Sequence, residues 1–205
     1  MWFSGVNMQS TPLSWSSVVA RFRCWSAVFA LACVFAPSAF AANQIERGQP
    51  SPTFELPSAA GEVSGTVRLA EHLRKGPVVV TMLRGYPGYQ CPICTRQVGE
   101  FIKFAPDFAA EDAKVFLIYP GPAEELRSKA DEFTENLNLP APITLVIDPD
   151  MTFVTEAGLR WDAPGETAYP ATWIIGSDGK VQWAKVSQSH GGRATAREVM
   201  RELRR

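Results

Sequence analysis

Residues 78–97 read VVVTMLRGYPGYQCPICTRQ, and this stretch decides the fold. Residues 78–83 are almost continuously apolar and rich in β-branched side chains, which is typical of a parallel strand buried on both faces. After a short loop, Cys91 and Cys94 open a segment whose apolar residues have helical spacing. The sequence therefore predicts a buried strand that leads directly to a Cys-Pro-Ile-Cys pair at the start of a helix.

The spacing of the two cysteines predicts a redox-active disulfide. Pro92 suits the first helical position, so Cys91 is the expected N-cap and Cys94 lies near the end of the first turn. A sulfur at a helix N-terminus is stabilised as thiolate by free N–H groups and the helix dipole. We expect Cys91 to be the nucleophile and Cys94 the resolving thiol, with Arg84 as stabiliser of a thiolate or peroxide and Arg96 as a second nearby cation.

The cysteine pair has two less reactive alternatives, a structural disulfide and a structural zinc site. A structural disulfide across so short a loop would restrain little of the unfolded chain. A structural zinc site needs four ligands, but His72 and His190 are distant in sequence and no second Cys-x-x-Cys is present. Redox chemistry is favoured over both, and we expect no metal and no organic cofactor.

The remaining periodicity predicts an α/β fold with a central mixed β-sheet flanked by helices. Further strands are expected at 54–56, 115–119 and 143–147, and a hairpin over 172–183. Helical spacing recurs at 98–105, 126–137 and 196–203, where Thr195 opens a capping box. Pro106 should kink or end the first of these helices.

The N-terminal 41 residues have the pattern of a secretory signal peptide. Residues 1–42 contain Arg21 and Arg23 as their only charges, followed by a short apolar run and an A-x-A site that predicts cleavage after Ala41. The run is short for a span of the ~30 Å hydrocarbon core, although an uncleaved anchor or a lipoprotein acylated at Cys33 stays an alternative. We expect an exported, periplasmic or extracytoplasmic domain over residues 42–205.

The charge balance and the cysteine count change when residues 1–41 are left out. The chain has 20 basic and 21 acidic residues and four cysteines; residues 42–205 keep 18 basic residues, 21 acidic residues and two cysteines. Such a balance argues against nucleic acid as a partner. After signal cleavage we expect no membrane association, and a redox partner protein or a small peroxide as reactant.

From residue 49 onward the chain resembles the alkyl-hydroperoxide-reductase and thiol-specific-antioxidant (AhpC/TSA) redoxins, which have the thioredoxin fold. The similarity rests on the arm PSPTFEL at 50–56, the strand-to-cysteine loop, Asp148-Pro149-Asp150, and residues 172–175 before the Asp178-Gly179 turn. The resemblance implies a thioredoxin-like fold, antioxidant redox homeostasis and either thiol–disulfide exchange or peroxide reduction.

Two departures from the peroxiredoxin pattern favour thiol–disulfide exchange. Pro87 and Cys94 match the family's proline and peroxidatic cysteine, but Cys91 occupies the place of the Thr or Ser, so Cys94 would be peroxidatic in the alternative. The family's late arginine is replaced by Pro170. In thioredoxin-like reductases a cis proline lies there, which makes Tyr169–Pro170 a cis candidate, with an ordinary strand-start proline as the alternative.

Other polar residues give weaker hypotheses. Asp148 and Asp150 are interpreted as turn residues at a strand end rather than an acid/base pair. Glu166 or Glu100 could relay protons to the inner cysteine. His190 could join the two cysteines as a copper ligand, as in copper-assembly members of this fold, which would make the chain a non-catalytic delivery module; a loop histidine is the favoured interpretation.

Overall fold

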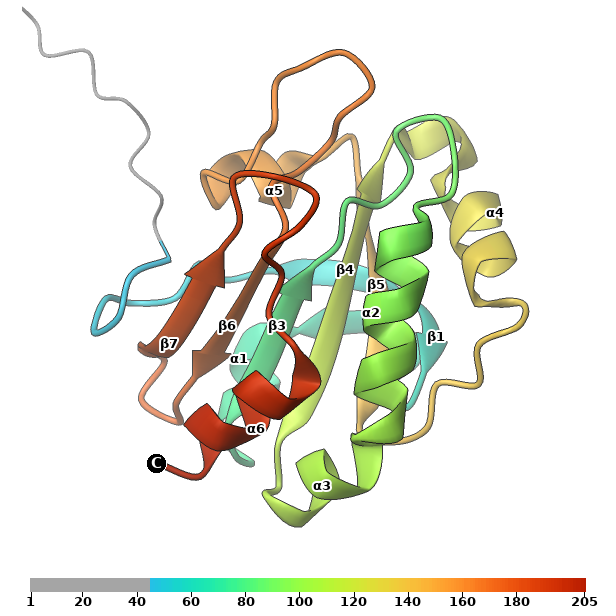
Figure 1. Cartoon of the computed structure of the whole chain (residues 1–205). Coiled ribbons are helices and arrows are strands. Elements are labelled where there is room, and N and C mark those ends of the chain that lie inside the picture. Colours follow the sequence, from blue (N-terminus) through green and yellow to red (C-terminus); the bar gives the residue numbers. More distant parts are fainter. Residues whose placement is uncertain (1–44) are drawn as a thin grey trace, which may run out of the picture. The chain divides into compact units, whose positions relative to one another are not determined.

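The computed structural model describes residues 45–205 (Figure 1). The predicted signal peptide, residues 1–41, lies outside the described residues. Within them no helix has the length and apolarity that crossing a membrane would require.

A seven-stranded mixed sheet forms the centre, with the order β2-β1-β5-β4-β3-β6-β7. The strands are β1 (Glu55–Gly61), β2 (Thr66–Arg68), β3 (Val78–Met82), β4 (Lys114–Gly121), β5 (Ile143–Pro149), β6 (Ala171–Ile175) and β7 (Val181–Val186). The three central strands β3, β4 and β5 are parallel, and antiparallel strands flank them on both sides. The predicted strands and the late hairpin are confirmed, and β3 lies between β4 and β6.

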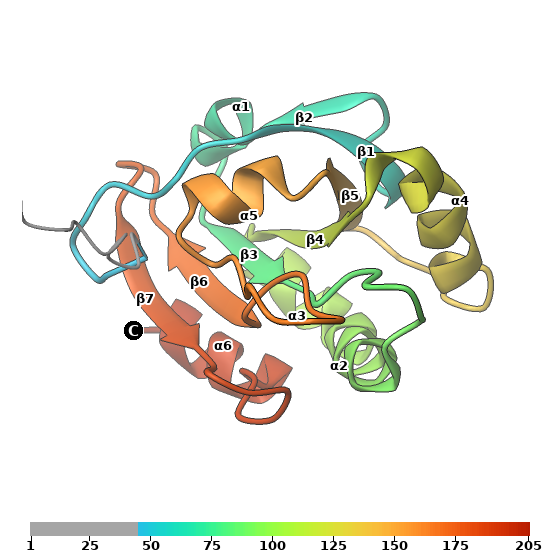
Figure 2. The same cartoon turned by 90° about the horizontal axis from the view of Figure 1, so that it is seen from above.

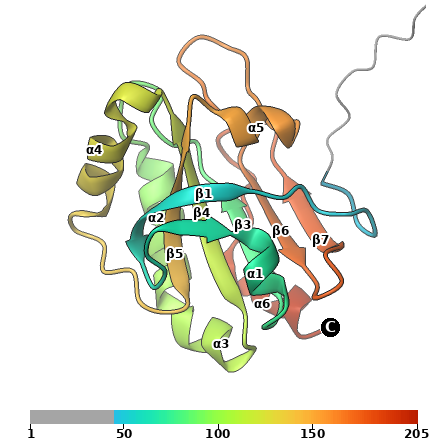
Figure 3. The same cartoon turned by 180° about the vertical axis from the view of Figure 1, so that it is seen from behind.

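Helices of the described part of the chain cover both faces of the sheet, as Figures 2 and 3 show. They are α1 (Leu69–Leu73), α2 (Pro92–Lys103), α3 (Ala105–Ala110), α4 (Ala123–Thr134), α5 (Thr152–Glu156) and α6 (Ala196–Leu203). Alternate residues of β3 and β4 enter opposite cores because side chains of a strand alternate between its faces. Val79 packs with residues of α2, α3, α4 and α6, whereas Val80 packs with residues of α1 and α5. The expected fold, a mixed sheet flanked by helices, is confirmed.

Helix boundaries follow local sequence signals in two places. α2 ends at Lys103 and α3 restarts at Ala105, with Pro106 in its first turn, as the proline predicted. The hydroxyl of Thr195 accepts a hydrogen bond from the Glu198 N–H at 3.1 Å and caps α6. The short elements β2, α1 and α5 were not predicted, since they are too brief to show a periodic apolar pattern.

Candidate active site

The strand-to-helix connection after β3 places both cysteines at the start of α2. Gly85 has φ +68°, and a Cβ there would lie 1.9 Å from the Pro120 carbonyl oxygen of β4, so only glycine lets the loop pass this close. Cys91 is the N-cap, as predicted, and its Sγ accepts a hydrogen bond from the Cys94 N–H at 3.4 Å. Both thiols are free; Cys91 keeps 3% of its surface exposed and Cys94 none.

The two thiols have opposite acidities. A hydrogen bond from the Cys94 thiol, opposed by burial and aided by the backbone N–H groups of Cys94 and Ile93, lowers the pKa of Cys91 to about 5. The same hydrogen bond, together with burial, raises the pKa of Cys94 well above its ordinary value. At neutral pH the proton is therefore held on the inner sulfur, and the outer one is a thiolate.

Arg84 lies at the end of β3, but its guanidinium is turned to other partners. Nε donates to Glu166 Oε2 at 2.5 Å, Nη1 to the Tyr89 hydroxyl at 2.5 Å, and Nη2 to the Gly165 carbonyl oxygen at 2.5 Å. Burial alone would lower the pKa of Arg84, but these hydrogen bonds to Glu166 and Tyr89 outweigh it and raise it. The backbone N–H of Arg84 donates a hydrogen bond to Cys94 that lowers that thiol's pKa.

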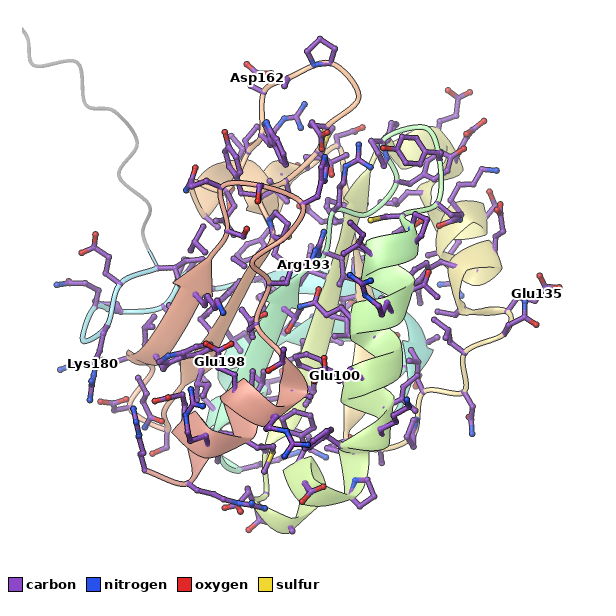
Figure 4. The ribbon with its side chains drawn as sticks, viewed as in Figure 1. Glu100, Glu135, Asp162, Lys180, Arg193 and Glu198 are labelled. Carbon is purple, nitrogen blue, oxygen red and sulfur yellow. The ribbon has the colours of Figure 1, made fainter. Side chains whose placement is uncertain are left out.

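Arg193, in the loop before α6, is the cation that acts on the thiols. Its charge lowers the pKa of both Cys91 and Cys94. Nη1 donates to the buried Gln97 Oε1 at 3.0 Å and Nε donates to the His190 carbonyl oxygen at 3.0 Å. Nη2 is buried and has no hydrogen-bond partner among residues 45–205. Figure 4 shows Arg193 between the chain leading into α6 and the helix α2.

A second set of contacts holds the cysteine loop from the side of β4. The Tyr119 hydroxyl donates to Gln90 Oε1 at 2.8 Å, and Gln90 Nε2 donates to the Lys129 carbonyl oxygen of α4 at 2.9 Å. Burial raises the pKa of Tyr119, against the hydrogen bond to Gln90. Tyr119 thus stays protonated and acts as a donor that fixes the residue preceding Cys91.

Comparison with known proteins gives the family. A family model described as AhpC/TSA family matches residues 47–184. The chain belongs to the AhpC/TSA family. The Mycobacterium tuberculosis protein named "Putative peroxiredoxin Rv2521" is 29% identical over 148 residues, which cover 68% of this chain and 83% of that protein.

Solved structures agree on the fold of this AhpC/TSA redoxin. Peroxidoxin BcpB from Mycobacterium tuberculosis superposes with a TM-score of 0.59 at 24% identity, covering 78% of this chain and 97% of that one. Mycobacterium tuberculosis AhpC gives a TM-score of 0.62 at 17% identity, covering 78% and 92%. The thioredoxin-like fold inferred from the cysteine loop and the late hairpin is therefore confirmed.

The expectation of a cis bond at Tyr169–Pro170 is wrong. Within residues 45–205 the cis peptide bond is Ala141–Pro142. The Pro170 carbonyl oxygen accepts a hydrogen bond from the Ser187 N–H at 2.8 Å, which extends the antiparallel pairing of β6 with β7 by one step. Pro170 thus lies at the start of a strand, the alternative that the sequence left open, and the chain enters β6 already extended.

The structure also places the weaker candidates. Glu166 pairs with Arg84 and with His190, whose Nε2 lies 3.2 Å from Glu166 Oε1, while Glu100 accepts from the Ala196 N–H at 3.1 Å. Asp148 is buried and accepts from two backbone N–H groups at the start of α5, which agrees with a turn role. Across the described part of the chain, no three His, Cys, Asp or Glu side chains gather as metal ligands, so His190 does not join the cysteines.

Sequence reasoning missed Arg193 and Gln97. These residues meet across 96 positions of the chain, and neither belongs to a motif. A buried polar residue at helical spacing after Cys94 was the one signal available, since Gln97 lies three residues further on the same helix face.

Proposed function

We propose that this AhpC/TSA redoxin is a thiol–disulfide oxidoreductase in which Cys91 attacks and Cys94 resolves. The observation that supports it best is the asymmetry of the pair. The outer sulfur is the helix N-cap and keeps some solvent access, whereas the inner sulfur is fully buried and holds the shared proton. A nucleophile needs a thiolate and a route to its substrate, and of the two sulfurs Cys91 has the lowered pKa and belongs to the residue with some surface exposed.

The first step joins the enzyme to its partner. The Cys91 thiolate attacks one sulfur of a disulfide in a partner protein, the Cys91–partner bond forms, the partner's S–S bond breaks, and one partner thiolate leaves and takes up a proton. The charge of Arg193 and the N–H groups of the first turn of α2 stabilise the attacking thiolate.

The second step releases the partner. Cys94 loses its proton and attacks the Cys91 sulfur, which forms the Cys91–Cys94 disulfide and expels the second partner sulfur as a thiol. The chain is oxidised by two electrons and the partner is reduced by two. An external dithiol protein restores the reduced pair by the same exchange in reverse.

Single cysteine variants test this assignment. Cys94→Ser should accumulate a mixed disulfide with a model protein disulfide, because the resolving sulfur is missing, whereas Cys91→Ser should form none. Trapping is read by non-reducing electrophoresis and mass spectrometry, with wild type and the double variant as controls. A stable adduct through Cys94 in Cys91→Ser would contradict the assignment.

Peroxide reduction is the second candidate, and two observations favour it. The Mycobacterium tuberculosis relative is named a putative peroxiredoxin, and Prx3 of Vibrio vulnificus, a structure of the same fold, has been solved in complex with H2O2. Arg193 also brings a guanidinium with one unpaired nitrogen to the thiols. In this chemistry the thiolate attacks one peroxide oxygen, the O–O bond breaks, and the leaving hydroxide takes up a proton from solvent to become water. The resulting sulfenic acid condenses with the thiol of the other cysteine to the disulfide, with loss of a second water.

The two activities separate in one assay series. Wild type, Cys91→Ser and Cys94→Ser are tested for hydrogen-peroxide consumption and for reduction of a model protein disulfide. Peroxide turnover that survives Cys91→Ser and is lost in Cys94→Ser would identify Cys94 as peroxidatic and overturn the primary proposal. Inactivity of wild type toward both substrates would leave a structural disulfide.

We also propose that the chain acts after export. The pattern over residues 1–41 supports this: two arginines, a short apolar run and a small-residue cleavage site. Expression of the full chain in a bacterial host, followed by fractionation and intact-mass measurement, tests it. A mature protein beginning at Ala42 in the periplasmic fraction is expected, and full-length protein in the cytoplasm would contradict the proposal.

A further inference from the structure

A groove runs beside the cysteine pair along α2. It has a volume of about 590 Å³ and lies between α2 and the loop that leads into α6. Ile93, which separates the two cysteines in sequence, lines one end, and Lys103 lines the other end of the helix. At 1.5 Å per residue these two positions are about 15 Å apart along the helix axis. The groove therefore starts at Ile93, the residue before Cys94, and leads along α2 away from the cysteine pair.

The cationic side chains that line this groove have no ion-pair partners in the described part of the chain. Arg96 and Lys103 also line it, and neither has a hydrogen-bond or ion-pair partner among residues 45–205. They lie seven residues apart and so face the same side of the helix. Glu100 also lines the groove between them; its carboxylate accepts a hydrogen bond from the neutral Ala196 N–H at the start of α6 and keeps its charge, so Arg96, Lys103 and Arg193 leave a net excess of about two positive charges (Figure 4). The third cation, Arg193, has its buried Nη2 unpaired.

The rest of the chain carries the opposite charge. Residues 42–205 have an excess of three acidic residues. Most of the other cations are paired: Arg68, Arg84, Lys114, Arg127, Lys129, Lys185, Arg201, Arg204 and Arg205 all form ion pairs. Unpaired positive charges thus gather near a redox thiol, although the chain as a whole is acidic. They are a local feature that attracts an anionic ligand, not a property of the whole surface.

We propose that this groove binds an acidic extended segment of the partner protein, next to the partner cysteine that reacts with Cys91. This inference rests on the proposed thiol–disulfide exchange. Arg96 and Lys103 are separated by about 10 Å along the helix. An extended chain covers that distance in about three residues, at ~3.3 Å each. Lys103 lies about 18 Å along the helix from Cys91, so two carboxylates within about six residues of the partner's cysteine would reach both cations while its sulfur lies at Cys91.

The length of the groove favours a peptide segment over a small thiol. A low-molecular-weight anionic thiol would reach the cation nearest the pair, Arg96, and leave Lys103 at the far end unused. A segment that runs along the groove uses both, and its carboxylates replace the missing ion-pair partners. Attraction over this distance acts on the association rate, so it is sensitive to ionic strength.

Matched peptide disulfides test the proposal with the reduced full chain. Three cysteine peptides of equal length, each joined to 2-thiopyridine, carry two Glu, two Gln or two Lys residues within about six positions of the cysteine. The release of 2-thiopyridone gives second-order rate constants. We expect the acidic peptide to react about 3–10 times faster than the neutral one at low salt, with the basic peptide slowest, and the difference to shrink at 0.5 M salt.

Variants assign the effect to the groove. The double variant Arg96→Gln/Lys103→Gln should lose the preference for the acidic peptide. The control Lys75→Gln/Lys180→Gln removes two exposed lysines away from the groove and should keep the preference; Figure 4 shows Lys180 by the β6–β7 turn. Loss of the preference in the control alone would overturn the assignment to α2.

The remaining outcomes separate this proposal from the function on which it rests. Equal rates for all three peptides with wild type would overturn the groove proposal and leave thiol–disulfide exchange standing. Failure of every peptide to react would overturn both. If oxidised glutathione shows the same dependence on Arg96 and Lys103 as the acidic peptide, the groove takes a small anionic thiol, and the segment proposal is overturned.

Discussion

Two arginine networks, around the buried Arg84 and the half-buried Arg193, lie near the cysteine pair, and they differ in what they leave unpaired. Arg84 follows β3 directly, and its guanidinium is engaged by Glu166, Tyr89 and Gly165. Arg193 comes from the far end of the chain and is held by Gln97 and a backbone carbonyl, with Nη2 left without a partner. Arg84, which is close to the cysteines in the sequence, thus holds loops to one another. Arg193, which is distant in the sequence, lowers the pKa of the thiols.

The comparison shows that proximity in sequence does not decide which cation acts on a site. A guanidinium neutralised by a carboxylate contributes little field to a third group, whereas one held by neutral acceptors keeps its full charge. Gln97 and the His190 carbonyl are neutral acceptors, so they orient Arg193 without cancelling it. Four substitutions test this division of roles.

The largest effect should come from Arg84→Met. The Glu166 side chain is only 11% exposed, so the substitution leaves a buried carboxylate without its main counter-ion. We expect a loss of about 3–5 kcal/mol in the free energy of unfolding, measured by urea denaturation. Arg127→Ala, which removes an exposed ion pair, is the control and should cost below ~1 kcal/mol. A loss as small as the control's would show that the Arg84 network is not a structural tie.

Cys94→Ala measures how much thiolate stabilisation is independent of either arginine. It removes the thiol that donates to Cys91, so the pKa of Cys91 should rise from about 5. The midpoint of the pH profile of iodoacetamide alkylation should move up by about 1–2 pH units, the equivalent of one charge-assisted hydrogen bond. Cys94→Ser keeps a donor and should move it less. An unchanged midpoint in Cys94→Ala would contradict the hydrogen-bond origin of the low pKa.

Arg193→Gln should raise the same midpoint by about 1 pH unit, because a cation that favours the thiolate is removed. Alkylation at pH 5–6 then slows, whereas alkylation above pH 8 stays close to wild type. Arg84→Gln is the matched comparison, and its midpoint should stay within a few tenths of a pH unit. A larger change in Arg84→Gln than in Arg193→Gln would reverse the roles given to the two networks.

Gln97→Leu should have the smallest effect on acidity. It removes the acceptor that orients Arg193 but not the charge, so the midpoint should rise by about half the change seen in Arg193→Gln. In the Arg193→Gln background the same substitution should add no further change, since its effect passes through Arg193. An additive rise in the double variant would assign Gln97 a direct role at the thiols.

The parts of the fold that the sequence predicted are those with strong local patterns. β3, the Cys91 N-cap and the break at Pro106 each follow from a run of adjacent residues. The predicted cis bond at Pro170 was wrong, because it relied on position in the chain, and a role of the Arg84 side chain at the thiols stays a prediction. Where the Arg84 guanidinium points depends on Glu166, 82 residues away, and the strand start at Pro170 depends on pairing with β7.

The sequence by itself determined that a buried strand ends at a helix capped by a cysteine, with a second cysteine one turn inside. Strand burial, N-capping and helix spacing are properties of a few consecutive residues. Only the tertiary structure decided which charges meet that pair. The sheet order brings the loop after β7 against α2, so that Arg193 joins residues of α2 and the free cations of that helix line a groove. These contacts depend on packing between segments that are far apart in the sequence, and no local sequence pattern predicts them.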